Sequence, residues 1–414
     1  MRRDTSLIYI ALTLSLMTIA ARATNNMVTT TIGPFSKYQL GFSNTLVGII
    51  TAVMFATTFL ATSYINPGLN PSIRRKVFII SNLVVVSLLP LFYFSSYVSI
   101  WILSAVIGLA FGMIMPNLIT AASLVNDRKA AERLLALYSA SLSISLILGP
   151  AYETFILSKF SYNFVFLAFI PLAVLGFVLS WTVRFPDTKK EVRGSKALRN
   201  KGFISSILAI TTYNVPFAAI TAFLTILAVD RFHVPSDLAY STYIPFFTMS
   251  FLTRLYMTIK PFRSLRLPML ISILITMITL AGTIVSPSYS VFLVLMALLG
   301  VPHGSVFPMS TIMIQRATSK EERNAVNSYF LAYNNFLFIA VPAAVGYLSN
   351  YIGLSITFGL LTIPVLLVSL YFFAKFWKDE ILVGESRLVR YSCVFHLKMK
   401  LSANLYSEPP IFSF

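Results

Sequence analysis

The chain has 414 residues, of which 57% are hydrophobic and 11% charged, and its mean hydropathy is +0.79. This composition excludes an ordinary soluble protein, because soluble domains carry about 25% charged residues. The formal net charge of +18 would suit a nucleic-acid-binding protein. The basic residues instead lie in short connections between apolar segments, so we expect a lipid bilayer as the partner and no nucleic acid.

Twelve apolar segments are long enough to cross a bilayer as helices, and they lack the alternation of a membrane β-barrel. We therefore predict an all-α membrane protein with twelve transmembrane helices. The predicted spans are residues 6–32, 43–62, 77–97, 99–122, 134–157, 162–184, 203–229, 238–259, 267–286, 290–314, 325–349 and 353–375.

A polar stretch at residues 186–201, the longest before the tail, divides these spans six and six. The predicted domains are an N-terminal six-helix bundle (1–184), a basic cytoplasmic linker (185–202), a C-terminal six-helix bundle (203–375) and a cytoplasmic tail (376–414). The tail has no apolar segment of spanning length, and we expect a loosely ordered end or a segment that lies on anionic lipid.

The first span also resembles a signal peptide, with Met1-Arg2-Arg3, an apolar run and Ala21-Arg22-Ala23 as a small-residue cleavage site. Cleavage there would leave eleven spans and would break the doubling seen in the rest of the chain. We therefore expect the first helix to be retained.

The distribution of positive charge predicts the orientation. Of the 32 Lys and Arg residues, Lys37, Lys159 and Arg231 lie in connections on one side, and Arg22 and Arg254 lie within spans. The remaining 27 lie at the termini and in connections on the other side, which the positive-inside rule makes cytoplasmic. We expect a multi-pass protein of the cell membrane with both termini in the cytoplasm.

A repeated motif marks the fourth span of each half. Gly108, Gly112 and Pro116 have the spacing G-x-x-x-G-x-x-x-P, and the same spacing recurs 192 positions later from Gly300 to Pro308. Two glycines four residues apart permit close helix packing, and each proline removes a helical hydrogen bond. The motif therefore indicates that the chain consists of two copies of one six-helix unit.

Two such halves, joined by a basic connection, resemble the major facilitator superfamily over residues 6–375. The resemblance implies inverted three-helix repeats within each half and a substrate site near the bilayer midplane. We expect this site between spans 1, 4, 5, 7, 10 and 11. Gly149-Pro150 is similar to the end of the antiporter motif of this family, which makes export one alternative.

The family usually carries the motif G-x-x-x-D-x-x-G-R-R/K after span two. This chain keeps the arginines but has amides at the first glycine and at the aspartate, and a second degraded copy follows span eight. The resemblance implies an inner gate at these connections, with other charges near spans five and eleven substituting for lost carboxylates. The gate candidates are Asn70, Arg74, Arg75, Glu132, Arg133, Arg254, Arg263, Glu322 and Arg323.

Arg22 lies in span one on a polar stripe with Thr18, Asn25, Asn26 and Thr29. Because an arginine at membrane depth costs about 2.5–3.5 kcal/mol on insertion scales, we expect it to face a cavity or a partner. The alternative is that its side chain extends to the outer headgroups.

Two further ionisable groups lie within spans. Glu153 in span five is a candidate for an ion pair with Arg22 or for binding a coupling proton. His303 in span ten, which corresponds to Phe111 in the first copy of the motif, is a candidate for proton binding or solute binding, and a neutral histidine inside the bundle is the alternative.

Other cavity candidates are polar or aromatic residues on helical stripes, and buried amides need partners in a bilayer. They hydrogen-bond either a solute or a neighbouring helix. These candidates are Asn117, Tyr213, Asn214, Tyr333 and Asn334.

We therefore predict a secondary active transporter that moves a small organic solute by alternating access, with proton coupling as one possibility and uniport as the other. A non-transporting membrane sensor or partner-binding protein of the same fold is the alternative.

The sequence has no nucleotide-binding loop, no hydrolase motif and a single cysteine, Cys393, so we expect no enzyme activity, no cofactor and no metal. We expect a monomer. The surplus of Arg22 and Arg254 over Glu153 favours an anionic solute, although we expect Arg254 outside the site.

Overall fold

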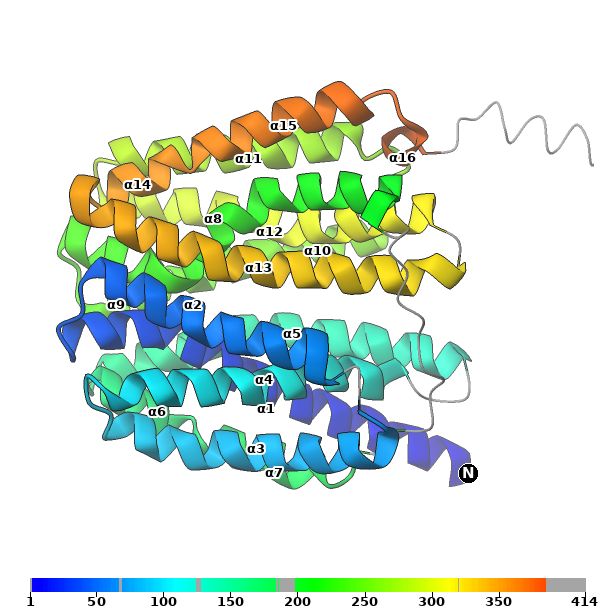
Figure 1. The fold of residues 1–414 in the computed structure, drawn as a ribbon, viewed down its shortest axis with the longest axis horizontal. Coiled ribbons are helices and arrows are strands. Elements are labelled where there is room, and N and C mark those ends of the chain that lie inside the picture. Colours follow the sequence, from blue (N-terminus) through cyan, green and yellow to red (C-terminus); the bar gives the residue numbers. More distant parts are fainter. Residues whose placement is uncertain are drawn as a thin grey trace, which may run out of the picture.

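The computed structural model describes residues 2–66, 69–123, 128–183, 185, 198–318 and 320–384. Within these ranges every regular element is a helix, and the long helices run side by side in two bundles (Figure 1). The elements are α1 (Arg2–Tyr38), α2 (Asn44–Leu60), η1 (Ala61–Ile65), α3 (Pro71–Tyr93), α4 (Ser99–Ser123), α5 (Arg128–Leu157), α6 (Tyr162–Ala168), α7 (Ile170–Ser180), α8 (Lys201–Phe232), α9 (Ser236–Ser241), α10 (Tyr243–Ile259), α11 (Arg266–Val285), α12 (Tyr289–Ala317), α13 (Lys320–Ile352), α14 (Leu354–Leu360), α15 (Thr362–Phe376) and α16 (Glu380–Val383).

The predicted all-α membrane fold is confirmed. Eleven helical segments of the described chain are long and apolar enough to cross a membrane, and three of them combine two elements, α2 with η1, α6 with α7 and α14 with α15. α9 with α10 occupies the predicted eighth span. The first helix is longer than predicted, because it begins at Arg2 and continues through residues 33–38 to Tyr38. The boundary of the predicted linker stays a prediction, since residues 184 and 186–197 lie outside the described part of the chain.

The last span of each half is interrupted at an equivalent position. α6 ends before Phe169 and α14 before Leu361, and these two residues are 192 positions apart in the chain. Pro171 and Pro364 follow the interruptions, and a proline lacks the N–H group that would continue the hydrogen-bond ladder. The doubling therefore extends from the glycine motif to the ends of both bundles.

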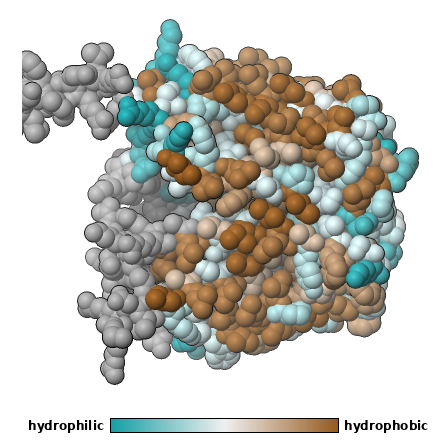
Figure 2. Space-filling view, turned by 180° about the vertical axis from the view of Figure 1, so that it is seen from behind, coloured by the Kyte–Doolittle hydropathy of each residue, from teal (hydrophilic) through white to brown (hydrophobic). Residues whose placement is uncertain are grey.

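The two ends of the bundles differ in charge. We call the end at which α3, α11 and α13 begin the basic face, because most Lys and Arg residues lie in its connections, and we call the other end the opposite face. The N-terminus and α16 both lie at the basic face (Figure 1). Figure 2 shows a broad hydrophobic surface between the two ends, with hydrophilic residues gathered at the edges. This surface suits a protein surrounded by lipid.

The glycine motifs hold α4 against α2 and α12 against α10. A Cβ atom added to Gly108 would lie 2.2 Å from the Met54 carbonyl oxygen, and one added to Gly300 would lie 2.1 Å from the Phe246 carbonyl oxygen. The hydroxyl of Thr58 donates to the Gly108 carbonyl at 2.9 Å. The expected close packing is therefore confirmed in both halves.

We predict that Gly300→Ala lowers the stability of the purified protein, because the new methyl group forces α10 and α12 apart. Overpacking of this kind costs about 1–3 kcal/mol. Thermal unfolding in detergent measures the effect. Gly149→Ala is the matched control, since a Cβ atom there meets no atom closer than 3.8 Å. Equal melting temperatures for the two variants would contradict the prediction.

Candidate functional site

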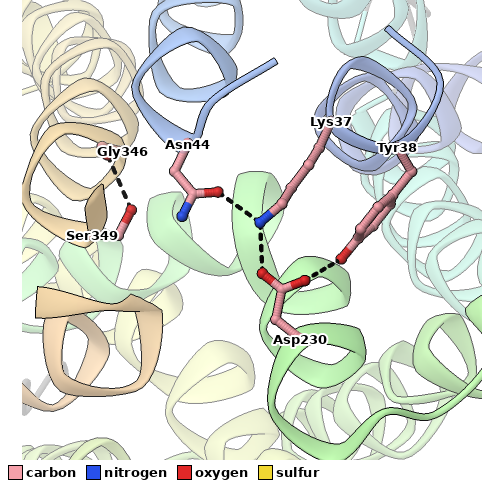
Figure 3. Close-up of polar contacts among 6 residues, drawn as sticks. All are labelled: Lys37, Tyr38, Asn44, Asp230, Gly346 and Ser349. Atoms are coloured by element: carbon pink, nitrogen blue, oxygen red, sulfur yellow. Dashed lines mark hydrogen bonds and ion pairs between the residues drawn. The ribbon is translucent and has the colours of Figure 1, made fainter. Parts of the chain in front are cut away.

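A cluster of charged residues joins the two halves at the opposite face (Figure 3). Lys37 Nζ at the end of α1 lies 2.5 Å from Asp230 Oδ2 near the end of α8, and Tyr38 donates its hydroxyl to the other carboxylate oxygen at 2.8 Å. Lys37 also donates to Asn44 Oδ1 at 2.9 Å. One carboxylate thus connects α8 to the end of α1.

Further polar contacts join the two halves along the opposite face. We call these contacts, together with those of Lys37, Tyr38 and Asp230, the seam. Asn350 Nδ2 of α13 donates to Thr45 Oγ1 of α2 at 2.6 Å. On the other side of the molecule, the Tyr240 hydroxyl donates to the Thr30 carbonyl at 3.0 Å. The hydrogen bonds that join the halves at Lys37, Tyr38, Thr45, Tyr162, Tyr240 and Asn350 all lie toward the opposite face. The halves are therefore closed against each other at that face.

Glu153 of α5 lies beside this seam. It is fully buried, and both its carboxyl oxygens lie 3.3 Å from Thr30 Oγ1 of α1. A hydroxyl has one proton, and the Thr30 hydroxyl has a shorter bond, 2.8 Å, to the Asn26 carbonyl. A proton on Glu153 that bonds the Thr30 oxygen satisfies both groups. The expected ion pair with Arg22 is wrong, because Arg22 lies two helical turns away and contacts α5 at another residue.

Arg22 reaches from α1 toward the basic face and donates through Nη2 to the hydroxyl of Tyr138 in α5. The alternative that it extends to the headgroups beyond the opposite face is wrong. Side chains of a helix point toward its N-terminus, which for α1 lies at the basic face. The polar stripe around Arg22 is only partly satisfied, since the Thr18 hydroxyl and Asn26 Nδ2 are buried without a partner, whereas Asn25 is half-buried.

Arg254 lies on α10 one turn after Ser250, in electrostatic range of Arg22, Tyr213 and His303. We expected it near the gate because it is close to the end of its span. However, α10 begins toward the opposite face, so a side chain that points toward its N-terminus reaches toward the middle of the bundle. The guanidinium makes no hydrogen bond with the described residues, and its Nε is buried. Arg254 therefore belongs with the central candidates.

His303 of α12 lies in an aromatic cluster. Its ring centroid is 4.5 Å from that of Phe217, 5.1 Å from that of Phe246 and 5.6 Å from that of Tyr213. Its Nδ1 lies 2.6 Å from the Ser250 hydroxyl oxygen. The histidine thus packs against α10, the same helix that the glycine motif approaches. The Tyr213 hydroxyl is buried without a partner and remains available to a ligand.

Three of the amide and tyrosine candidates connect helices. Asn214 of α8 donates to Asn334 Oδ1 of α13 at 2.5 Å, and Asn334 donates to the Phe330 carbonyl at 2.9 Å. The Tyr333 hydroxyl lies 2.6 Å from the Thr211 hydroxyl. These contacts favour helix packing over solute binding for this set.

Two other polar candidates near the basic face bond within the N-terminal bundle. Asn117 of α4 donates to Asn66 Oδ1 at 2.8 Å and is fully buried. Arg75 donates to the Trp181 carbonyl at 3.0 Å. The Arg75 bond joins the start of α3 to the end of α7. The Asn117 bond joins α4 to the residue that follows η1.

The remaining gate candidates also make local contacts where they are described. Asn70 caps α3 by accepting from the Ile73 N–H at 2.9 Å, and Arg74 donates to the Leu69 carbonyl at 3.3 Å. The side chain of Arg263 is exposed. The gate role of these residues stays a prediction. The side chains of Glu132, Arg133, Glu322 and Arg323 lie outside the described residues.

The start of the predicted tail is ordered against the basic face. Leu382 is fully buried and its carbonyl accepts from the Leu265 N–H at 2.8 Å. Arg316 of α12 donates to the Ile381 carbonyl at 2.8 Å and to the Arg263 carbonyl at 2.7 Å. The expectation of a loosely ordered end is therefore wrong for residues 379–383, where Ile381 and Leu382 are buried and α16 contacts α12.

Sequence reasoning missed the seam and Tyr138. A signal for the seam exists, because Lys37 and Asp230 are rare charges at the ends of two spans and have opposite sign. Tyr138 carried no such signal, since it is one of 20 tyrosines in the chain. Among the described residues, no group of three His, Cys, Asp or Glu side chains is arranged to hold a metal ion.

Comparison with known proteins assigns the family. The model of the Major Facilitator Superfamily matches residues 14–267 and 262–391. The chain belongs to the Major Facilitator Superfamily. This membership agrees with the resemblance drawn from the repeated halves, and it makes the chain a multi-pass protein of a transporter family. No curated protein matches the chain.

Solved transporters share the fold at low sequence identity. A POT family transporter in complex with 5-aminolevulinic acid has a TM-score of 0.71 at 11% identity, over 90% of this chain and 96% of that one. An inward-facing, occupied bacterial homolog of the human lysosomal transporter Spinster gives 0.68 at 12%, over 88% and 96%. The nucleoside transporter NupG gives 0.65 at 13%, over 89% and 100%.

We predict that Asn334→Leu lowers the melting temperature of the purified protein, because it leaves the Asn214 amide buried without a partner, at a cost of about 1–3 kcal/mol. Adding Asn214→Leu should restore most of the loss, since both polar groups are then gone. Thermal unfolding of the single and double variants measures this coupling. Additive losses would contradict the assignment of this pair to helix packing.

Proposed function

We propose that this protein is a secondary active transporter that moves a small organic solute across a cell membrane by alternating access. The position of the seam carries the proposal. The described bonds between the halves gather near the opposite face, whereas Arg22 and Arg254, one from each half, lie deeper without full partners. Alternating access needs a site between two halves that close at one face while the other face opens.

The distance along α1 supports this arrangement. Arg22 is eight residues from Thr30, which contacts the C-terminal half, and this corresponds to about 12 Å along a helix. The seam therefore lies beyond the candidate site on the way to the opposite face. A solute bound near Arg22 would be separated from the opposite face by the bonds of Lys37, Thr45 and Tyr240.

The positive-inside rule supports a cytoplasmic position for the basic face and both termini. In that orientation the described conformation is closed to the outside. We propose that one chain suffices for transport, because both halves of the site come from the same chain. No step of the proposal needs a cofactor or catalytic group.

We predict that locking the seam abolishes transport. Thr45→Cys and Asn350→Cys, in a Cys393→Ser background, place two thiols where side chains now lie in hydrogen-bond contact. The solute is one found by a thermal-shift screen of the purified protein. Counterflow of that solute in proteoliposomes should stop when the thiols are oxidised and should return on reduction, whereas binding in detergent persists.

The single variants Thr45→Cys and Asn350→Cys, treated with the same oxidant, are the controls. Transport that continues at full rate with the cross-link formed would contradict alternating access across this seam. A solute that binds the unlocked protein and never crosses the bilayer would contradict transport itself and would indicate a membrane sensor of the same fold.

We further propose that Glu153 carries a coupling proton. Among the acidic side chains whose burial the structure describes, it is the fully buried one, and it contacts a hydroxyl rather than a cation. An uncompensated charge buried away from water costs several kcal/mol, so this carboxyl group needs a proton while the seam is closed. Its position beside the Thr30 contact with Tyr240 would connect its protonation to closure of the seam.

We predict that Glu153→Gln abolishes solute accumulation driven by a pH gradient and leaves counterflow of the same solute within about threefold of the original rate, because the amide imitates the protonated acid. Proteoliposomes with and without a pH gradient separate the two activities. Glu380→Gln, which removes an exposed carboxyl group in α16, is the control. Gradient-driven accumulation that survives in Glu153→Gln would exclude this residue as the proton site.

A further inference from the structure

We propose that the space between the halves is an anion site, in which Arg22 and Arg254 bind the carboxylate or phosphate group of a small organic solute. The proposal rests on the proposed function for the statement that this solute is transported. The binding site itself is argued from the side chains alone, and it can be tested without transport.

The first observation is a set of buried donors without acceptors. Arg22 Nε and Asn26 Nδ2 of α1, the Tyr213 hydroxyl of α8 and Arg254 Nε of α10 are all buried without a hydrogen-bond partner. The guanidinium and amide nitrogens only donate, and the tyrosine hydroxyl donates or accepts. Buried polar groups are nearly always bonded. The missing partner of this set is therefore an acceptor.

The second observation is the absence of a compensating acid. In the part of the chain that the structure describes, the ion pairs are Lys37 with Asp230 and Lys201 with Asp379, and both lie at the ends of the bundles. Among the acids whose side chains the structure describes, Glu153 is the fully buried one, and it is bonded to Thr30 two turns away from Arg22. Two half-buried arginine side chains thus lack a carboxylate partner in the described part of the protein.

The third observation is convergence of the two arginines. Arg22 on α1 points toward the basic face and Arg254 on α10 points toward the opposite face, so both approach the middle of the bundle from different halves. They lie in electrostatic range of each other, and α5, which Arg22 contacts through Tyr138, packs against α10. Like charges at this range repel, and a bound anion removes the repulsion.

The neighbouring side chains suggest the rest of the solute. Tyr213 stacks on Phe217 with ring centroids 5.7 Å apart, and Phe217 stacks on Phe246 at 6.1 Å. These rings provide an apolar, aromatic wall next to the Tyr213 hydroxyl. Guanidinium groups bind planar carboxylates and phosphates through paired hydrogen bonds. The site therefore suits a small anion with a compact apolar or aromatic body.

The test measures thermal unfolding of the purified protein in detergent with benzoate, malonate or inorganic phosphate, each against chloride at equal ionic strength. Benzamide and malonamide are the neutral counterparts. We expect at least one anion to raise the melting temperature by about 1–2 °C near ten times its dissociation constant, and the neutral counterparts to have no effect. No shift with any of the three anions would overturn the proposal.

The arginine variants connect the effect to this site. Arg254→Gln and Arg22→Gln should each weaken binding of the stabilising anion by about 10- to 100-fold, and Arg254→Lys should weaken it less. Without an anion, Arg254→Gln should unfold at a higher temperature than the original protein, because one of two repelling charges is gone. Lys260→Gln removes a charge from the exposed end of α10 and is the matched control.

Two outcomes would overturn the assignment. One is an unchanged anion effect in both glutamine variants, and the other is stabilisation by short-chain phosphatidylglycerol alone, which would identify a lipid headgroup site. Failure of the anion site is distinguishable from failure of transport. A neutral solute that exchanges across the bilayer would contradict the anion site and leave the transporter intact, whereas anion binding without exchange would do the reverse.

Discussion

A bilayer provides no water to a buried polar group, so each such group must find its partner within the protein or in a ligand. The described helices obey this constraint at most positions. Serine and threonine hydroxyls bond backbone carbonyls one turn earlier, as Ser104 and Thr276 do, and the amides Asn214 and Asn334 bond each other. Some buried polar atoms lack a partner, and among them the Nε atoms of Arg22 and Arg254 come one from each half.

The same constraint organises the two ends of the molecule. At the opposite face, Lys37 pairs with Asp230 and Tyr240 bonds Thr30, and each of these contacts joins one half to the other. At the basic face, Arg75 and Arg316 bond backbone carbonyls of their own half. These arginines of the basic face thus bond within their own half, whereas the contacts at the opposite face join one half to the other.

Most of the fold could be predicted from the sequence, because hydropathy and the charge of the connections depend on local residues. The spans, the doubling and the close approach at Gly300 all follow from such patterns. The partners of side chains could not be predicted in this way. Lys37 and Asp230 are far apart in the chain, and Arg254 was placed by the position of its Cα atom, whereas its long side chain reaches a different depth.

The equal spacing of the two halves has an evolutionary consequence. α6 and α14 begin 192 positions apart, as do the interruptions after them and α5 and α13, so this part of the two halves keeps the same residue spacing, as expected for a duplicated gene. Each residue of α5 then has an ancestral counterpart in α13. Glu153 corresponds to Val345, and both side chains are buried. The carboxyl group is therefore present in one half alone, so the two halves share their helix arrangement and differ in the ionisable group at this position.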